Sequence, residues 1–74
     1  MTKRRKKGMK WLRDKMDTLG YTSLEQVANE LNINRGNLYR YFILETKPSV
    51  AMLPIMADVF ETDYEDILYA LDVL

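Results

Sequence analysis

The segment from Asn34 to Arg40 carries hydrogen-bonding side chains at spacings that suit the edges of DNA bases. An arginine can donate two parallel bonds to guanine O6 and N7, and an asparagine can pair with adenine. Arg35, Asn37 and Arg40 supply these groups, while Gly36 would let the backbone approach a base pair closely. We therefore predict that these four residues contact bases in the major groove. The alternative interpretation of the arginines is a solvated helix face.

A second group of polar side chains can hold a duplex by its phosphates. Contacts to phosphate fix the position of a protein on DNA without reading its sequence. The predicted members of this group are Ser23, Asn34, Tyr39 and Lys47. For Tyr39, partial burial against the preceding helix is an equally plausible role.

The chain begins with a basic segment, residues 1–7 (MTKRRKK), that has no apolar periodicity. Five like charges in succession favour a flexible arm over packed structure. Because basic arms can follow phosphates or enter the minor groove, Arg4 and Arg5 are predicted DNA contacts. A solubilising tail or a coincidental nuclear-localisation-like run would have the same composition. The folded DNA-binding domain is expected to span residues 8–74.

Two short amphipathic helices joined by a tight turn are predicted between Ser23 and Phe42. The first opens with a capping box formed by Ser23 and Gln26. Its apolar residues recur at i, i+3, i+4 and i+7 and define one buried face: Leu24, Val27, Ala28 and Leu31. Asn32 tolerates the left-handed backbone of a sharp turn, and Asn34 is suited to cap the second helix. The apolar face of that helix is formed by Leu38, Tyr41 and Phe42.

Three further helices are expected around this pair. The first ends at Gly20, and its apolar stripe is Met9, Leu12, Met16 and Leu19. The fourth is expected to be capped by Ser49, with Pro54 delaying its start or kinking it, and its stripe is Val50, Leu53, Met56, Ala57 and Phe60. The fifth opens with a capping box of Thr62 and Glu65, and its stripe is Tyr64, Ile67, Leu68 and Leu71. Since no segment alternates with period two, the predicted fold class is all-α, a compact five-helix domain.

From Ser23 to Leu68 the chain resembles the Cro- and repressor-type helix-turn-helix family, also called XRE. The resemblance is carried by five segments at the family's spacings: Val27–Ala28, Asn32–Asn34, Lys47–Ser49, Val50–Phe60 and Tyr64–Leu68. It implies a lambda-repressor-like domain that binds operator DNA, usually as a dimer. The segment RGNLYRYF at residues 35–42 also resembles the recognition helix of TetR-type repressors. Where the XRE family often has glutamine, this chain has Leu24.

Charge is divided unevenly along the chain, although the total is zero. Residues 1–40 hold ten basic side chains against four acidic ones, and residues 41–74 hold one basic against seven acidic ones. Such a chain can present one face to a polyanion and keep the other away from it. Cysteine and histidine are absent, which removes disulfides, thiolate metal sites and the commonest general base. We therefore expect no enzyme activity, no metal or other cofactor and no small-molecule ligand.

Apolar residues that exceed the predicted core indicate an interface. Residues 42–44 are consecutive and apolar, so not all of them can face one core, and further apolar residues lie beyond the last stripe. We predict a homodimer that uses Ile43, Leu44, Tyr69, Val73 and Leu74. The alternative is that the domain buries these side chains itself.

The favoured function is a sequence-specific transcriptional regulator, a repressor that occludes a promoter as a homodimer on double-stranded operator DNA. The alternative is a protein-binding adaptor or antitoxin module, whose apolar loop at residues 42–44 and acidic C-terminal half would bind a partner. A membrane-surface protein is less favoured because Asp14 and Asp17 interrupt the basic first helix. No apolar run approaches the roughly 20 residues that cross a bilayer, so a cytoplasmic, nucleoid-associated location is expected.

Overall fold

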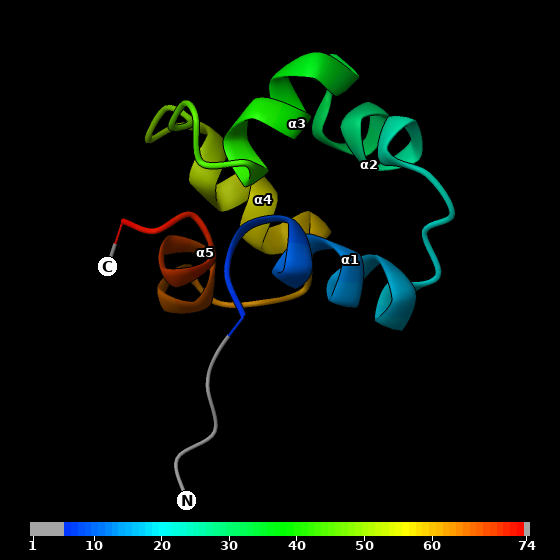
Figure 1. The fold of residues 1–74 in the computed structure, drawn as a ribbon, viewed down its shortest axis with the longest axis horizontal. Helices are drawn as coiled ribbons and strands as arrows, with labels where there is room; N and C mark the ends of the chain where they lie inside the picture. The colour runs from blue at the N-terminus through cyan, green and yellow to red at the C-terminus, as the bar shows by residue number, and fades with distance from the viewer. Residues whose placement is uncertain (1–5, 74) are drawn as a thin grey trace, which may run out of the picture.

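A computed structural model of the chain describes residues 6–73 (Figure 1). Within this range the chain forms five helices and no strand: α1 (Gly8–Leu19), α2 (Leu24–Leu31), α3 (Arg35–Phe42), α4 (Met52–Val59) and α5 (Tyr64–Ala70). The predicted all-α, five-helix fold class is confirmed. None of the described helices is both long enough and apolar enough to cross a membrane.

Three aromatic rings form the centre of the core. The ring of Trp11 stacks on Phe42 at 5.8 Å between centroids, with 4° between the ring planes. Phe60 meets both rings edge-on, at 5.3 and 6.0 Å. These arrangements are favourable for aromatic pairs, and each pair adds about 0.5–1.5 kcal/mol beyond the burial of its area. The cluster therefore joins α1 to the end of α3 and to the end of α4.

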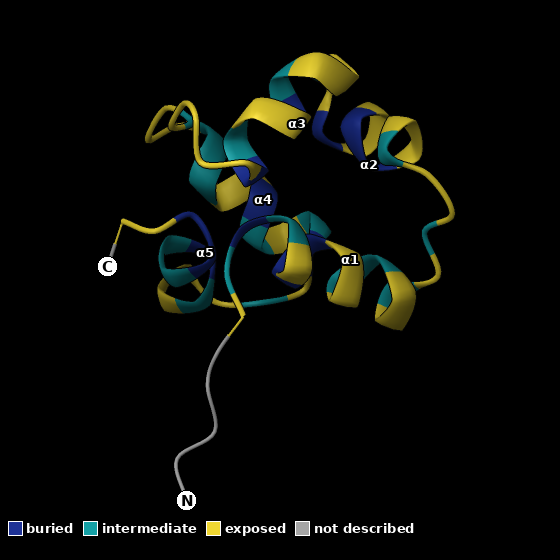
Figure 2. Ribbon diagram, in the orientation of Figure 1, coloured by how far each residue is buried: buried dark blue, intermediate teal, exposed yellow. Residues whose placement is uncertain are grey.

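Aliphatic side chains from every helix complete the core: Leu12, Val27, Leu31, Leu38, Met56, Ile67 and Leu71. Helix α3 packs against α1 and α2, whereas α4 packs against α2 and α5. Figure 2 shows that the buried residues face inward and that exposed residues follow the outer side of α2 and α3. The sequence prediction missed Trp11, which is 6% exposed, while Leu19 is only half-buried.

The predicted starts of α2 and α3 are confirmed. The hydroxyl oxygen of Ser23 accepts a hydrogen bond from the Gln26 amide at 3.1 Å. The Gln26 side chain reaches back to the amide of Thr22, at 2.8 Å, which is one residue earlier than a capping box requires. Asn34 Oδ1 accepts from the Asn37 amide at 2.7 Å. The first turn of α3 is thus capped by a side chain.

Each of the five helices ends in the same way. The residue that closes each helix end has a left-handed backbone, with φ between 52° and 84°: Gly20, Asn32, Leu44, Glu61 and Asp72. The amide that follows donates to a carbonyl five residues earlier, at 2.8–3.0 Å, as in a Schellman motif. Gly20 and Asn32 were predicted from their residue types. Leu44 and Glu61 are types that adopt this conformation at a cost, so the sequence did not reveal these two ends.

The start of α4 differs from the prediction. Ser49 does not cap the helix, which begins at Met52 after an N-cap, Ala51, that makes no side-chain bond. Val50 precedes the helix and is 83% exposed, so its predicted place in the core is wrong. Pro54 is the third residue of α4, where amides have no helical partner and the missing N–H removes no helical bond. The predicted delay of the helix by Pro54 is therefore confirmed.

The start of α5 is displaced by one residue from the prediction. Asp63, not Thr62, is the N-cap, and its carboxylate accepts from the Asp66 amide at 2.9 Å. The Thr62 hydroxyl donates to the Asp66 carboxylate at 2.7 Å. Tyr64 is 52% exposed instead of buried, because it lies one turn before the buried face that Ile67 begins.

The start of α1 packs closely against the end of α3. Gly8, the first residue of α1, is buried and has a φ of +60°. A Cβ at this position would lie 2.7 Å from the carbonyl oxygen of Phe42. Lys6 and Lys7, the last two residues of the predicted arm, make ion pairs with Asp14 and Asp72, at 3.2 and 2.7 Å.

Candidate nucleic-acid interface

Helix α3 has one buried and one polar side. Leu38 and Phe42 are fully buried on the inner side. Most of the predicted base-contacting and phosphate-contacting residues of this helix are exposed: Arg35, Gly36, Tyr39 and Arg40. Tyr39 is 48% exposed and lines a depression together with Leu24 of α2, so it is partly buried beside this helix and also reaches solvent. The structure therefore brings together the predicted contact residues of α3 on its solvent side (Figure 2).

Arg40 is oriented by two neighbours on this surface. Its Nη1 donates to Asn37 Oδ1 at 3.2 Å, and its Nε lies 3.7 Å from a carboxylate oxygen of Glu45. Exposed contacts of this kind contribute little to stability, so a ligand can replace them. Pairing of Asn37 with adenine would use the same oxygen that Arg40 now binds. Because an amide oxygen can accept two hydrogen bonds, it can bind an adenine amino group while it keeps its contact with Arg40.

Carboxylates share the surface of both arginines. Glu45 pairs with Arg40, and Glu25 lines a surface cleft of about 440 Å³ that is also lined by Arg35. Glu25 lies in the first turn of α2, where the helix dipole makes a negative charge favourable. The exposed side of α3 is thus mixed in charge. Binding to a polyanion here would depend on the directed bonds of the arginines as well as on net charge.

Ser23 and Asn34 use their side-chain oxygens as helix caps. These bonds leave the hydroxyl proton of Ser23 and the amide protons of Asn34 as donors for a phosphate. Both residues also hold a helix of the α2–α3 pair in place. Their predicted phosphate contacts are compatible with their capping roles.

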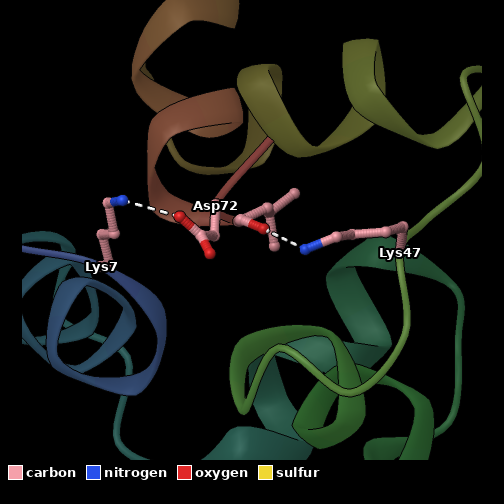
Figure 3. A network of polar contacts seen from close by, with 4 residues as sticks. Lys7, Lys47 and Asp72 are labelled. Atoms are coloured by element: carbon pink, nitrogen blue, oxygen red, sulfur yellow. Dashed lines mark hydrogen bonds and ion pairs between the residues drawn. The ribbon is translucent and has the colours of Figure 1, made fainter. Parts of the chain in front are cut away.

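Lys47 has a structural partner. Its ammonium donates to the backbone carbonyl of Leu71 at 2.6 Å, at the end of α5 (Figure 3). A positive charge is favourable at this end of a helix. The predicted phosphate contact of Lys47 would require it to leave this partner.

Lys7, the residue directly before α1, also lies at the end of α5. Lys7 donates to the carboxylate of Asp72 at 2.7 Å (Figure 3). Its ammonium lies 4.7 Å from the centre of the Tyr69 ring. The hydrogen bond to Asp72 raises the pKa of Lys7 above its usual value, and the bond to Lys7 lowers the pKa of Asp72. The predicted arm contacts Arg4 and Arg5 lie outside the described residues.

The predicted dimer residues are distributed around the ends of α3 and α5. Ile43, Leu44 and Val73 are 39%, 36% and 52% exposed, whereas Tyr69 is half-buried. Leu44 flanks Gly8, and Tyr69 lies beneath Lys7, so both border the entry into α1. The remaining member of the prediction, Leu74, lies outside the described residues.

Leu24, which the sequence prediction placed on the apolar stripe of α2, also reaches the surface. It is half-buried and packs against the core. It also lines a depression of about 300 Å³ together with Arg35, Gly36 and Tyr39. Its place on the apolar stripe of α2 concealed this second environment, because the stripe alone does not show where α3 lies.

No protein-family model, curated protein or solved structure matches this chain. The resemblance to the XRE family thus depends on the residue spacings given above.

Proposed function

We propose that this protein binds double-stranded DNA through α3 and is a sequence-specific transcriptional regulator. In this proposal α2, the turn at residues 32–34 and α3 act as a helix-turn-helix, as the resemblance to the XRE family implies. The observation that carries the proposal is the solvent side of α3, where Arg35, Gly36 and Arg40 are exposed opposite a fully buried face. The major groove admits an α-helix, and the side chains of the two arginines are donors that match guanine there.

The proposed regulator is a homodimer that represses by occluding a promoter. Two copies joined near the ends of α3 and α5 would present two α3 helices to successive major grooves, about 34 Å apart. Ile43, Leu44 and Val73 supply the exposed apolar groups for such a contact. A cytoplasmic, nucleoid-associated location follows from this proposal.

The decisive experiment is selection of binding sites from random duplexes, followed by titration of the best duplex at low salt. The double variant Arg35→Ala/Arg40→Ala should lose affinity, because each arginine–guanine pairing contributes about 1–3 kcal/mol of discrimination. The matched control is Arg13→Ala, which removes an exposed arginine from α1. Equal affinities of the wild type and the double variant would refute the proposal.

The alternative function is a protein-binding module. It is supported by Ile43 and Leu44, two apolar side chains that the domain leaves exposed at the end of α3. The substitution Ile43→Glu should abolish capture of such a partner and spare contacts made by Arg35. Partner binding that survives Arg35→Ala/Arg40→Ala but not Ile43→Glu would favour this alternative.

A further inference from the structure

A shallow depression lies between the start of α2 and the solvent side of α3. It has a volume of about 300 Å³ and is lined by Leu24, Arg35, Gly36 and Tyr39. Leucine and tyrosine contribute carbon surface, and the guanidinium of Arg35 is the one charged group among these four residues. Tyr39 is 48% exposed, and Leu24 is half-buried. Two large apolar side chains thus stay partly exposed on the surface that is proposed to bind DNA.

Leu24 is held in a defined place. It is the first residue of α2 and directly follows the N-cap Ser23, whose side chain binds the Gln26 amide. Gln26 in turn binds the Thr22 amide and hydroxyl, at 2.8 and 3.2 Å. On the α2 side the depression is therefore bounded by Leu24, whose backbone position is held by these hydrogen bonds.

Gly36 is not required by the packing of the fold. It has an ordinary negative φ, and an added Cβ would meet only Asn34 Oδ1, at 3.4 Å. Glycine weakens a helix relative to alanine by up to about 1 kcal/mol. Its effect on the surface is to leave the depression open, which suits a position that another molecule approaches closely.

We infer that this depression receives the C5-methyl group of a thymine in the major groove. The inference rests on the proposed DNA binding by α3. Thymine is the base that presents a methyl group there, and apolar side chains recognise it by contact. Leu24 and Tyr39 supply the apolar walls, and Arg35 at the edge is placed to bind a neighbouring guanine. The predicted recognition element is a T·A pair next to a G·C pair, and Tyr39 acts through its ring as well as its hydroxyl.

The test uses the best duplex from the random selection and replaces each thymine in turn by deoxyuridine, which removes only the methyl group. One position per half-site, next to the guanine that Arg35 contacts, should lose affinity about fourfold, as expected for about 0.8 kcal/mol per buried methyl-sized group. Replacement of the other thymines should leave the affinity unchanged. The readout is the ratio of the two dissociation constants, measured on the full chain.

Two variants assign the methyl contact to the depression. Leu24→Ala should bring the thymine-to-uracil ratio close to one. Gly36→Ala should also lower this ratio by adding a methyl group to the lining of the depression, and because alanine favours the helix, its thermal stability should equal or exceed that of the wild type. Arg40→Ala is the control: it should lower the affinity for both duplexes and keep their ratio.

Three results would overturn the inference while leaving the proposed function intact. These are a selected site without thymine beside the contacted guanine, equal affinities for every thymine and uracil pair, and a ratio that persists in both Leu24→Ala and Gly36→Ala. Failure of the wild type to bind any duplex at low salt would instead refute the proposed function, and the inference with it.

Discussion

The ammonium group of Lys7 donates a 2.7 Å hydrogen bond to the carboxylate of Asp72 and so joins the two ends of the described chain (Figure 3). A second lysine, Lys47, donates to the carbonyl of Leu71 beside it. The end of α5 is thus held by two cations, one from before α1 and one from the α3–α4 loop. Both partners of the Lys7–Asp72 pair are partly exposed, so solvent and salt weaken it.

Removal of the Asp72 carboxylate should lower the thermal stability in a pH-dependent way. Asp72→Asn suits this test because asparagine also tolerates the left-handed backbone at this position. The pKa of Asp72 is lowered in the folded protein, so its contribution is present above its ordinary pKa of 3.8 and is lost as the pH falls through the lowered value. Melting temperatures of both proteins, measured between about pH 2 and 7, should converge at the acidic end.

Stability at alkaline pH, where Lys7 loses its proton, gives an independent check of the Lys7–Asp72 pair. Because the pKa of Lys7 is raised above its ordinary 10.5, its contribution is complete below that value and is lost as the pH rises through the raised one. The Lys7→Met variant should show the same difference as Asp72→Asn at neutral pH, and the double variant should show no further loss. A difference that stays constant down to the acidic end would contradict the role given to this pair.

Glu61→Gly should stabilise the protein. Glu61 closes α4 with a φ of 52°, a conformation that costs most residues about 1–2 kcal/mol and glycine almost nothing. Since glycine also loses more entropy on folding, the expected net gain in unfolding free energy is about 0.5–1 kcal/mol. Chemical denaturation measures this gain. The control Glu65→Gly places glycine inside α5 and should destabilise by about 1 kcal/mol, so a loss of stability in both variants would argue against the left-handed helix end.

Gly8→Ala should destabilise the protein more than Gly20→Ala. Both glycines have positive φ, at 60° and 84°, so alanine is strained at either site. Only at Gly8 would the added Cβ also overlap a backbone atom, the Phe42 oxygen at 2.7 Å, whereas nothing lies within 4 Å at Gly20. The difference in unfolding free energy between the variants should be at least about 1 kcal/mol. Equal losses would show that the contact between Gly8 and α3 relaxes without cost.

The affinity for DNA should fall steeply with salt if the proposed function is correct. A dimer that neutralises about four phosphates per subunit should show a slope of about −7 in a plot of log affinity against log salt concentration. The double variant Arg4→Ala/Arg5→Ala should reduce the slope to about −3.6, since about half of these contacts are lost. Replacement of Arg35, a proposed base contact, should lower affinity and leave the slope nearly unchanged. An unaltered slope in the Arg4/Arg5 variant would remove the arm from the interface.

The sequence predicted most reliably what depends on neighbouring residues. The caps Ser23 and Asn34 and the turn residue Asn32 act through backbone atoms within a few positions of themselves, so their types are sufficient evidence. The same holds for the delay of α4 by Pro54. The candidate surface of α3 follows directly from these local features and from the burial of Leu38.

Features that depend on distant residues were missed or misplaced. Trp11 is adjacent to the predicted stripe of α1, and its burial is decided by Phe42 and Phe60, which arrive from elsewhere in the chain. Nothing in the sequence around Lys47 indicates that this residue binds the end of α5. The depression beside Leu24 likewise exists only because α3 is packed next to α2. Local chemistry therefore predicted the exposed side of α3, while the detailed shape of that side needed the fold.

The single tryptophan gives the molecule a built-in optical reporter. Its indole is stacked on Phe42 at the last residue of α3, on the side away from solvent. Emission should shift when the domain melts, without any added dye. A spectrum that changes when an oligonucleotide is added would show that binding at the outer side of α3 shifts the packing of its inner side. An unchanged spectrum would show that the packing of α3 stays the same on binding.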